Sequence, residues 1–108
     1  SETLRDLLQL FGHEVVTAPC GRSGLELAHT FRPEVVLCDL GLPTMDGYAV
    51  AAALRGDPTT ASSYLVALSG YGHEEDQRRS REAGFDLHLT KPVDAESLQR
   101  LLETLRQR

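Results

Sequence analysis

Residues 34–39, EVVLCD, hold four consecutive apolar residues between Glu34 and Asp39. The run EVVTAP at 14–19 is short and rich in β-branched residues, and YLVALSG at 64–70 is again almost continuously apolar. A strand with one face in water alternates apolar and polar residues, whereas a strand of a parallel sheet is buried on both faces. These runs therefore predict strands of a parallel sheet with helices on both of its faces.

Helical patterns alternate with these runs. Leu4, Leu7, Leu8 and Phe11 recur at helical spacing, and we expect Gly12 to end that helix. Four further helices are expected. The first has Leu25, Ala28 and Phe31 on its inner face, the second is alanine-rich and runs from Tyr48 to about Arg55, and the third is polar and ends at Ala83. The last runs from the N-cap Asp94 to about Arg106 and buries four leucines, Leu98, Leu101, Leu102 and Leu105.

The segment FDLHLT at 85–90 alternates, with Phe85, Leu87 and Leu89 on one side, which predicts a half-exposed edge strand. The expected order of elements is therefore α-β-α-β-α-β-α-β-α. This order indicates a single α/β domain over residues 1–108, a doubly wound parallel sheet of the flavodoxin-like type.

Composition excludes several classes of function. The net charge of −5 counts against direct binding to nucleic acid. No apolar run approaches the ~18 residues of a membrane span, and no signal peptide opens the chain. Cys20 and Cys38 have neither metal-ligand spacing nor a disulfide pattern, and Cys38 is expected in the core. We expect a cytoplasmic protein that binds no membrane.

Three predicted strands end near polar residues, Asp39, Ser69 and Lys91. Because parallel strands share a direction, all three residues are expected at one edge of the sheet, where such folds bind their ligands. A carboxylate can attack phosphorus, and a hydroxyl and an ammonium can stabilise the charge on the transferred group. The pattern favours phosphoryl transfer onto Asp39, although each residue alone is more typical of a turn or a solvated loop.

The sequences VVLCDLGLPTMDG, VALSGYG and AGFDLHLTKP, with the closing amphipathic helix, resemble a bacterial response-regulator receiver domain of the CheY-like type. The resemblance covers essentially the whole chain and is greatest to the receivers of hybrid sensor histidine kinases. It implies that Asp39 takes a phosphoryl group from the phosphohistidine of a histidine kinase or a histidine phosphotransfer protein, which includes a covalently linked hybrid kinase.

The same resemblance implies further roles. Ser69 is the implied switch hydroxyl, Lys91 contacts the phosphoryl group and precedes a cis peptide bond to Pro92, and the backbones of Leu40 and Gly70 border that group. Asp39 and the carbonyl of Gly41 are implied ligands of Mg²⁺. The fourth helix, the last strand and the last helix form the implied partner-binding surface. Such a domain is a signalling phosphoacceptor and not an enzyme, because any catalysis concerns only its own phosphorylation and dephosphorylation.

The family has a further central strand between the strands at 14–19 and 34–39, and this strand ends in the pair of acids that completes the Mg²⁺ site. The sequence begins beside the first helix, and Glu2 and Asp6 do not replace that pair. We therefore expect a receiver that is incomplete at its N-terminus and binds Mg²⁺ poorly. Backbone groups beside the missing strand would stay unpaired unless a second chain, as in a dimer or a strand exchange, fills the place or the sheet closes up.

His88 stands three residues before Lys91, where the family usually has a tyrosine or phenylalanine that moves with the switch hydroxyl. A switch role for His88 and an exposed position on an edge strand are both compatible with the sequence. One alternative function is a pseudo-receiver, an interaction module that works without phosphorylation. Another is a flavodoxin-like small-molecule binder or hydrolase, but the sequence lacks a glycine-rich phosphate loop and a nucleophile beside a base.

Overall fold

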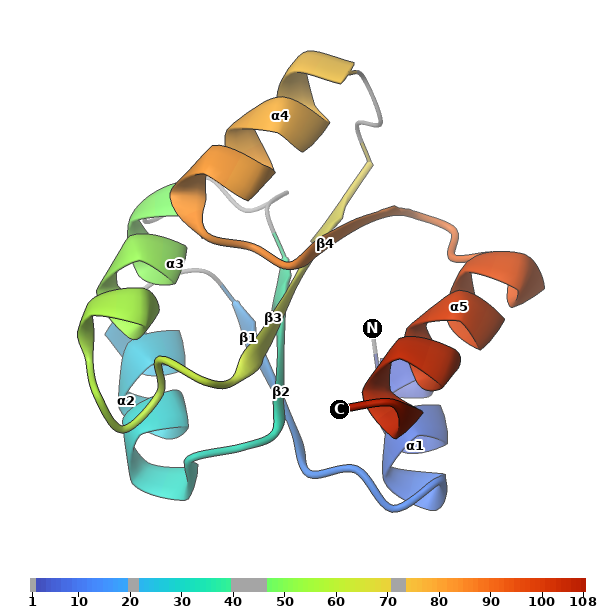
Figure 1. Ribbon diagram of the computed structural model, residues 1–108, viewed down its shortest axis with the longest axis horizontal. Helices are drawn as coiled ribbons and strands as arrows, with labels where there is room; N and C mark the ends of the chain where they lie inside the picture. The colour runs from blue at the N-terminus through green and yellow to red at the C-terminus, as the bar shows by residue number, and fades with distance from the viewer. Residues whose placement is uncertain (1, 20–21, 40–46, 71–73) are drawn as a thin grey trace.

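The computed structural model describes residues 2–19, 22–39, 47–70 and 74–108 (Figure 1). Helices and strands alternate along the described chain, as the apolar runs and helical patterns predict. They are α1 (Glu2–Leu10), β1 (Val15–Pro19), α2 (Arg22–Phe31), β2 (Val35–Asp39), α3 (Gly47–Gly56), β3 (Tyr64–Ser69), α4 (Glu74–Ala83), β4 (Leu87–Thr90) and α5 (Ala95–Arg106).

The described strands form one parallel sheet in the order β1-β2-β3-β4. β1 pairs directly with β2 over five residues, from Val15 opposite Val35 to Pro19 opposite Asp39. The expected unpaired backbone between these two strands is therefore absent from the described sheet. Of the two expected outcomes, the sheet closes up, because direct pairing satisfies the hydrogen-bonding groups that a missing neighbour would leave unpaired.

Helices cover both faces of the sheet, with α1 and α5 on one face and α2, α3 and α4 on the other (Figure 1). Successive side chains of β2 lie on opposite faces of the sheet. Val35 and Leu37 belong to the cluster beneath α1 and α5, and Val36 and Cys38 belong to the cluster beneath α2, α3 and α4. β3 divides its residues in the same way. This division explains why both strands are apolar throughout, and it places Cys38 in the core as expected.

Three aromatic residues depart from the sequence prediction. Phe11, which follows α1, and Phe31, the last residue of α2, are each 62% exposed. Phe31 keeps the spacing of the inner face, but the helix ends there and Arg32 turns the chain with a φ of 46°, so its ring lies outside the core. Phe85 packs in the cluster beneath α2, α3 and α4, on the other face of the sheet from Leu87 and Leu89. It precedes β4, so the alternation of that strand does not extend to it.

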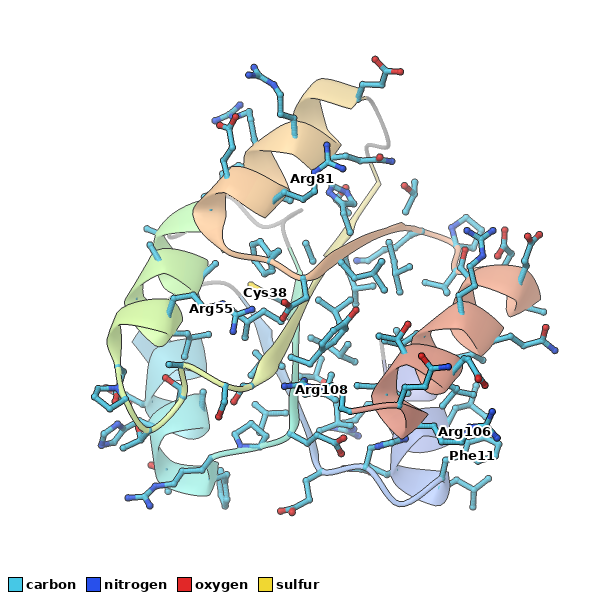
Figure 2. All side chains as sticks on the ribbon, viewed as in Figure 1. Phe11, Cys38, Arg55, Arg81, Arg106 and Arg108 are labelled. Carbon is cyan, nitrogen blue, oxygen red and sulfur yellow. The ribbon has the colours of Figure 1, made fainter. Side chains whose placement is uncertain are left out.

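Arg55, near the end of α3, binds two segments of the chain, residues 61–63 before β3 and residues 84–86 before β4; Figure 2 labels its side chain. Its guanidinium donates to the carbonyl oxygens of Ala61 and Ser63, both at 2.8 Å, and to that of Gly84 at 2.9 Å. It also pairs with the Asp86 carboxylate, which accepts the backbone N–H of Leu65 at 2.8 Å. Arg55 therefore fixes the segments that lead into β3 and β4.

Replacing Arg55 tests this network. We expect Arg55→Ala to lower the free energy of unfolding by about 2–4 kcal/mol, chiefly because it leaves three carbonyl oxygens without their donor, while the exposed Asp86 carboxylate adds little. Arg55→Lys keeps the charge but loses the planar fork of donors, so it should recover only part of that loss. Urea unfolding followed by circular dichroism gives both values. Arg78→Ala on the exposed face of α4 is the control, and an equal loss in that variant would contradict the assignment.

Asp57 organises the turn between α3 and β3. Its carboxylate accepts the backbone N–H of Thr59 at 2.9 Å and the Thr59 hydroxyl at 2.8 Å, and it pairs with His29 Nδ1 of α2 at 2.9 Å. The backbone hydrogen bond from Thr59, then the hydroxyl and then His29 lower the pKa of Asp57 from 3.8 to about 2. The ionised form therefore holds this turn against α2.

The lowered pKa of Asp57 means that the folded protein loses stability as the pH falls. Because the folded pKa lies below the ordinary value, the stabilisation from Asp57 is complete above pH 3.8 and is lost as the pH falls through about 2. An NMR titration of the Asp57 carboxyl carbon should show its midpoint near pH 2. In Thr59→Ala the midpoint should rise only part of the way to 3.8, since the backbone donor remains. A midpoint near 3.8 in the unmodified protein would contradict the geometry.

Candidate functional site

The candidate site lies at the carboxyl edge of the sheet, where β2, β3 and β4 end. Asp39 pairs in register with Leu68, and Ser69 pairs with Thr90, the residue before Lys91. The backbone N–H of Lys91 donates to the carbonyl oxygen of Ser69 at 2.8 Å. The backbones of Asp39, Ser69 and Lys91 therefore lie on neighbouring strands at one edge, as parallel strands require.

Part of the expected site lies outside the described residues. For Asp39 the structure describes the backbone at the end of β2 but not the side chain. Leu40, expected to border the phosphoryl group, and Gly41, expected to give a carbonyl to Mg²⁺, both fall in the undescribed segment 40–46. Gly70 is described, and a Cβ built on it would meet no atom of the described residues within 4 Å.

Ser69 is buried, with 3% of its surface exposed, and its hydroxyl contacts the ring of His88. Ser69 Oγ lies 2.9 Å from His88 Nε2, and Ser80 Oγ of α4 lies 2.9 Å from His88 Nδ1. A neutral imidazole has one donor and one acceptor nitrogen, whereas a hydroxyl can act as either, so both contacts can be satisfied together. His88 thus joins the end of β3 to the buried side of α4.

His88 faces α4 because of its place in the sheet. It pairs in register with Ala67, which belongs to the cluster beneath α2, α3 and α4. The half-buried ring therefore lies on the opposite face from Leu87 and Leu89, which pack toward α1 and α5. The His88 side chain is therefore half-buried and not exposed, and its role as a switch residue stays a prediction.

Ser80 is a member of this arrangement that the sequence analysis missed. It is fully buried, although α4 consists mainly of charged residues. The signal that could have identified it is its spacing, since Ser80 and Ala83 are small residues three positions apart in a helix that otherwise carries long polar side chains. One small polar residue lets the helix approach the sheet and reach His88.

Lys91 follows β4, and the Lys91–Pro92 peptide bond is cis, as the family resemblance implies. Lys91 and Pro92 border a cavity of about 300 Å³ that Leu4, Leu7, Leu68, Val93 and Leu98 also line. Lys91 therefore lies where the end of β4 meets an apolar hollow between α1 and α5.

The described residues contain no group of three or more His, Cys, Asp and Glu side chains that could hold a metal ion. The two expected Mg²⁺ ligands, the Asp39 carboxylate and the Gly41 carbonyl, are not among the atoms described. In the same ranges, none of the helices has the length and apolar character needed to cross a membrane.

Comparison with known proteins gives one consistent result. The family model of the response regulator receiver domain matches residues 1–103. The polar-differentiation response regulator DivK of Brucella anthropi is 29% identical over 102 residues, which are 94% of this chain and 80% of that protein.

Solved structures agree with the sequence comparison. A putative response regulator from Chloroflexus aurantiacus is 27% identical, with a TM-score of 0.79 over 100% of this chain and 92% of that one. The receiver domain of a Pseudomonas aeruginosa sensor histidine kinase has the same fold at 24% identity, with a TM-score of 0.79 over 99% of this chain and 88% of that one. That structure is described with a magnesium ion coordinated in its active-site cleft.

Proposed function

Because the chain belongs to the response regulator receiver domain family, we propose that it accepts a phosphoryl group on Asp39 and thereby switches a surface that binds a partner. The receiver domain is a part of two-component signalling. The observation that carries the proposal is the strand register that brings the backbones of Asp39, Ser69 and Lys91 to one edge. A carboxylate, a hydroxyl and an ammonium together match the needs of phosphoryl transfer.

The proposed donor is the phosphohistidine of a histidine kinase or of a histidine phosphotransfer protein. An oxygen of the Asp39 carboxylate attacks phosphorus, the phosphorus–nitrogen bond of the donor breaks, and the released imidazole takes up a proton from water. Lys91 contacts one phosphoryl oxygen as a positive charge, and the Ser69 hydroxyl donates to another. Mg²⁺ is the expected cofactor of an intact receiver domain, and a structural relative is described with it in the active-site cleft. This chain, without the acidic pair of the first strand, is expected to bind Mg²⁺ poorly.

The contacts of His88 suggest how the signal leaves the site. If Ser69 Oγ turns toward Asp39 to donate to a phosphoryl oxygen, it moves away from its present contact with His88 Nε2, which is at 2.9 Å. His88 would then lose one of the two partners that hold its ring, and its contact with Ser80 would transmit the change to α4. The surface formed by α4, β4 and α5 is the proposed partner-binding surface. In this scheme Ser80 is a positioning residue that acts through His88.

Phosphorylation itself is tested by incubating the protein with acetyl phosphate and measuring its intact mass, with the Mg²⁺ concentration raised until the result no longer changes, because weak binding of the ion is expected. We expect a gain of about 80 Da, one phosphoryl group. Asp39→Asn should abolish the gain, and Asp57→Asn, which removes a carboxylate at the far end of α3, should leave it unchanged. A gain that persists in Asp39→Asn would overturn the assignment of the acceptor. No gain in the unmodified protein would instead favour the pseudo-receiver, which works without phosphorylation.

The path through Ser80 is tested by hydrogen exchange of the α4 amides with and without acetyl phosphate. In Ser80→Ala the mass gain should be unchanged, because Ser80 does not reach the phosphoryl group. The change in α4 exchange on phosphorylation should fall to less than about half of that in the unmodified protein, since the hydroxyl that joins α4 to His88 is gone. Arg81→Ala on the exposed side of α4 is the control. An undiminished response in Ser80→Ala would rule out this path.

A further inference from the structure

Two adjacent residues of α4 contact two different elements. The guanidinium carbon of Arg79 lies 5.0 Å from the centre of the Tyr48 ring of α3, which is within the range of a cation–π interaction. The next residue, Ser80, has its hydroxyl oxygen 2.9 Å from Nδ1 of His88 in β4. One turn of α4 is therefore bound to α3 on one side and to the sheet on the other.

The Tyr48 ring gives Arg79 a fixed partner. Tyr48 is half-buried and packs against the cluster beneath α2, α3 and α4, so the core holds its ring in place. The Arg79 side chain is exposed and reaches this ring from α4, which packs beside α3 (Figure 1). The contact can therefore form and break without opening the core.

Tyr48 is also close in sequence to the proposed phosphoryl acceptor. α3 begins at Gly47, so Tyr48 directly follows the segment that leads from Asp39 to this helix. The Arg79 contact therefore joins α4 to the end of that segment. A displacement of α4 relative to α3 would have to break this contact, in addition to any change at the Ser80 contact.

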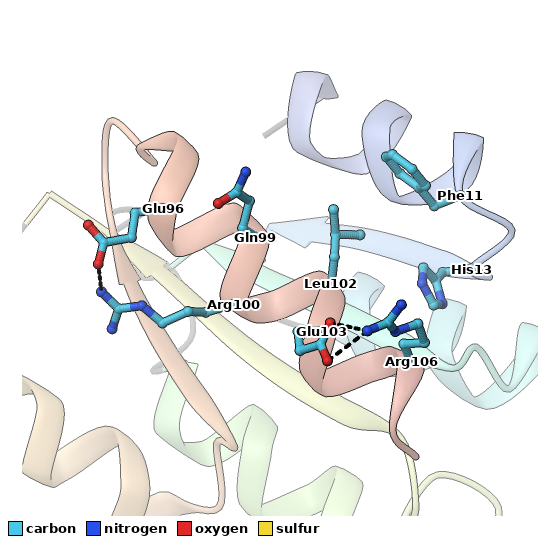
Figure 3. Close-up of a pocket in the computed structure, with 8 residues that line it drawn as sticks. All are labelled: Phe11, His13, Glu96, Gln99, Arg100, Leu102, Glu103 and Arg106. Atoms are coloured by element: carbon cyan, nitrogen blue, oxygen red, sulfur yellow. Dashed lines mark hydrogen bonds and ion pairs between the residues drawn. The ribbon is translucent and has the colours of Figure 1, made fainter.

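Two other arginines on helix surfaces differ from Arg79 in this respect. Arg100 of α5 pairs with Glu96 of the same helix at 2.7 Å (Figure 3), and Arg78 of α4 pairs with Glu82 at 3.4 Å. A pair within one helix moves with that helix and does not resist its displacement. The contact of Arg79 crosses from one helix to another, so it depends on their relative position.

We propose that Arg79 is a positioning residue for the switch, and that its contact with Tyr48 stabilises the position of α4 in the unphosphorylated protein. The proposal rests on the proposed function, in which phosphorylation of Asp39 acts on α4 through His88. A contact that exists in only one of two positions shifts the equilibrium toward that position. Loss of an exposed cation–π contact should raise the population of the displaced position about two- to fivefold.

The two contacts of α4 then have opposite effects. The Ser80 hydroxyl transmits the change from His88 to the helix, whereas Arg79 resists the displacement that follows. Ser80→Ala should weaken the response of α4 to phosphorylation. Loss of the Arg79 contact should instead bring α4 of the unphosphorylated protein closer to its phosphorylated position.

The test is NMR of the backbone amides of β4 and of those in α4 that lie more than one turn from the substitution. The two reference spectra are those of the protein without substitutions, before addition of acetyl phosphate and after its mass gain is complete. For two positions in fast exchange, each resonance of a variant lies on the line between these limits. In Arg79→Ala without acetyl phosphate, the resonances should move along this line toward the phosphorylated limit. Arg79→Lys should move less, because it keeps the charge, and Arg78→Ala is the control and should not move.

Matched variants of Tyr48 separate the aromatic ring from its apolar volume. Tyr48→Phe keeps the ring and should resemble the protein without substitutions, whereas Tyr48→Leu has an apolar side chain without a ring and should resemble Arg79→Ala. Adding Arg79→Ala to Tyr48→Leu should cause no further movement, because the contact is already lost.

Three results would overturn the proposal: resonances of Arg79→Ala that stay in place or leave the line, an equal movement in Arg78→Ala, or full additivity of Arg79→Ala and Tyr48→Leu. The mass gain with acetyl phosphate distinguishes this failure from failure of the proposed function. A mass gain without movement in Arg79→Ala contradicts only the role of Arg79. Absence of the mass gain contradicts the proposed function, and the role of Arg79 with it.

Discussion

The Arg55 guanidinium joins the end of α3 to the segments that enter β3 and β4, and the geometry of the candidate site depends on this junction. Its four hydrogen bonds bind Ala61 and Ser63 before β3, and Gly84 and Asp86 before β4. Asp86 in turn accepts the N–H of Leu65, so the start of β4 is locked to the start of β3. The offset between these strands decides that Ser69 lies opposite Thr90 and that its hydroxyl meets His88. A contact at the amino end of the sheet thus aligns residues at the carboxyl end.

Much of this fold could be predicted from the sequence, because a strand that is buried on both faces has apolar residues at successive positions. The continuous apolar runs of β2 and β3 identify a covered parallel sheet, and the Asp94 side chain caps α5 through the N–H of Ser97, as expected. Phe31 and Phe85 could not be placed, since periodicity holds only inside an element and both residues lie at a boundary. The direct pairing of β1 with β2 was one of two open outcomes, because sequence patterns do not specify which strands are neighbours.

The candidate site could be predicted in part for a similar reason. Parallel strands bring their carboxyl ends together, so the residues at the ends of β2, β3 and β4 could be assigned to one edge from the chain alone. The contact between His88 and Ser80 could not be predicted, because it depends on how closely α4 approaches the sheet. A helix rich in charged residues gives little sign of its buried side, and one serine hydroxyl accounts for the specific contact.

The division of the core into two clusters by the sheet has a consequence for signalling. His88 and α4 lie on one side of the sheet, whereas α5 packs on the other side against residues such as Val66 and Leu68. The backbone of β4 separates the two clusters, because its successive side chains belong to opposite layers. A rearrangement that repacks α4 can therefore proceed while α5 keeps its position. The sheet separates the two layers, so one layer can keep its packing while the other rearranges.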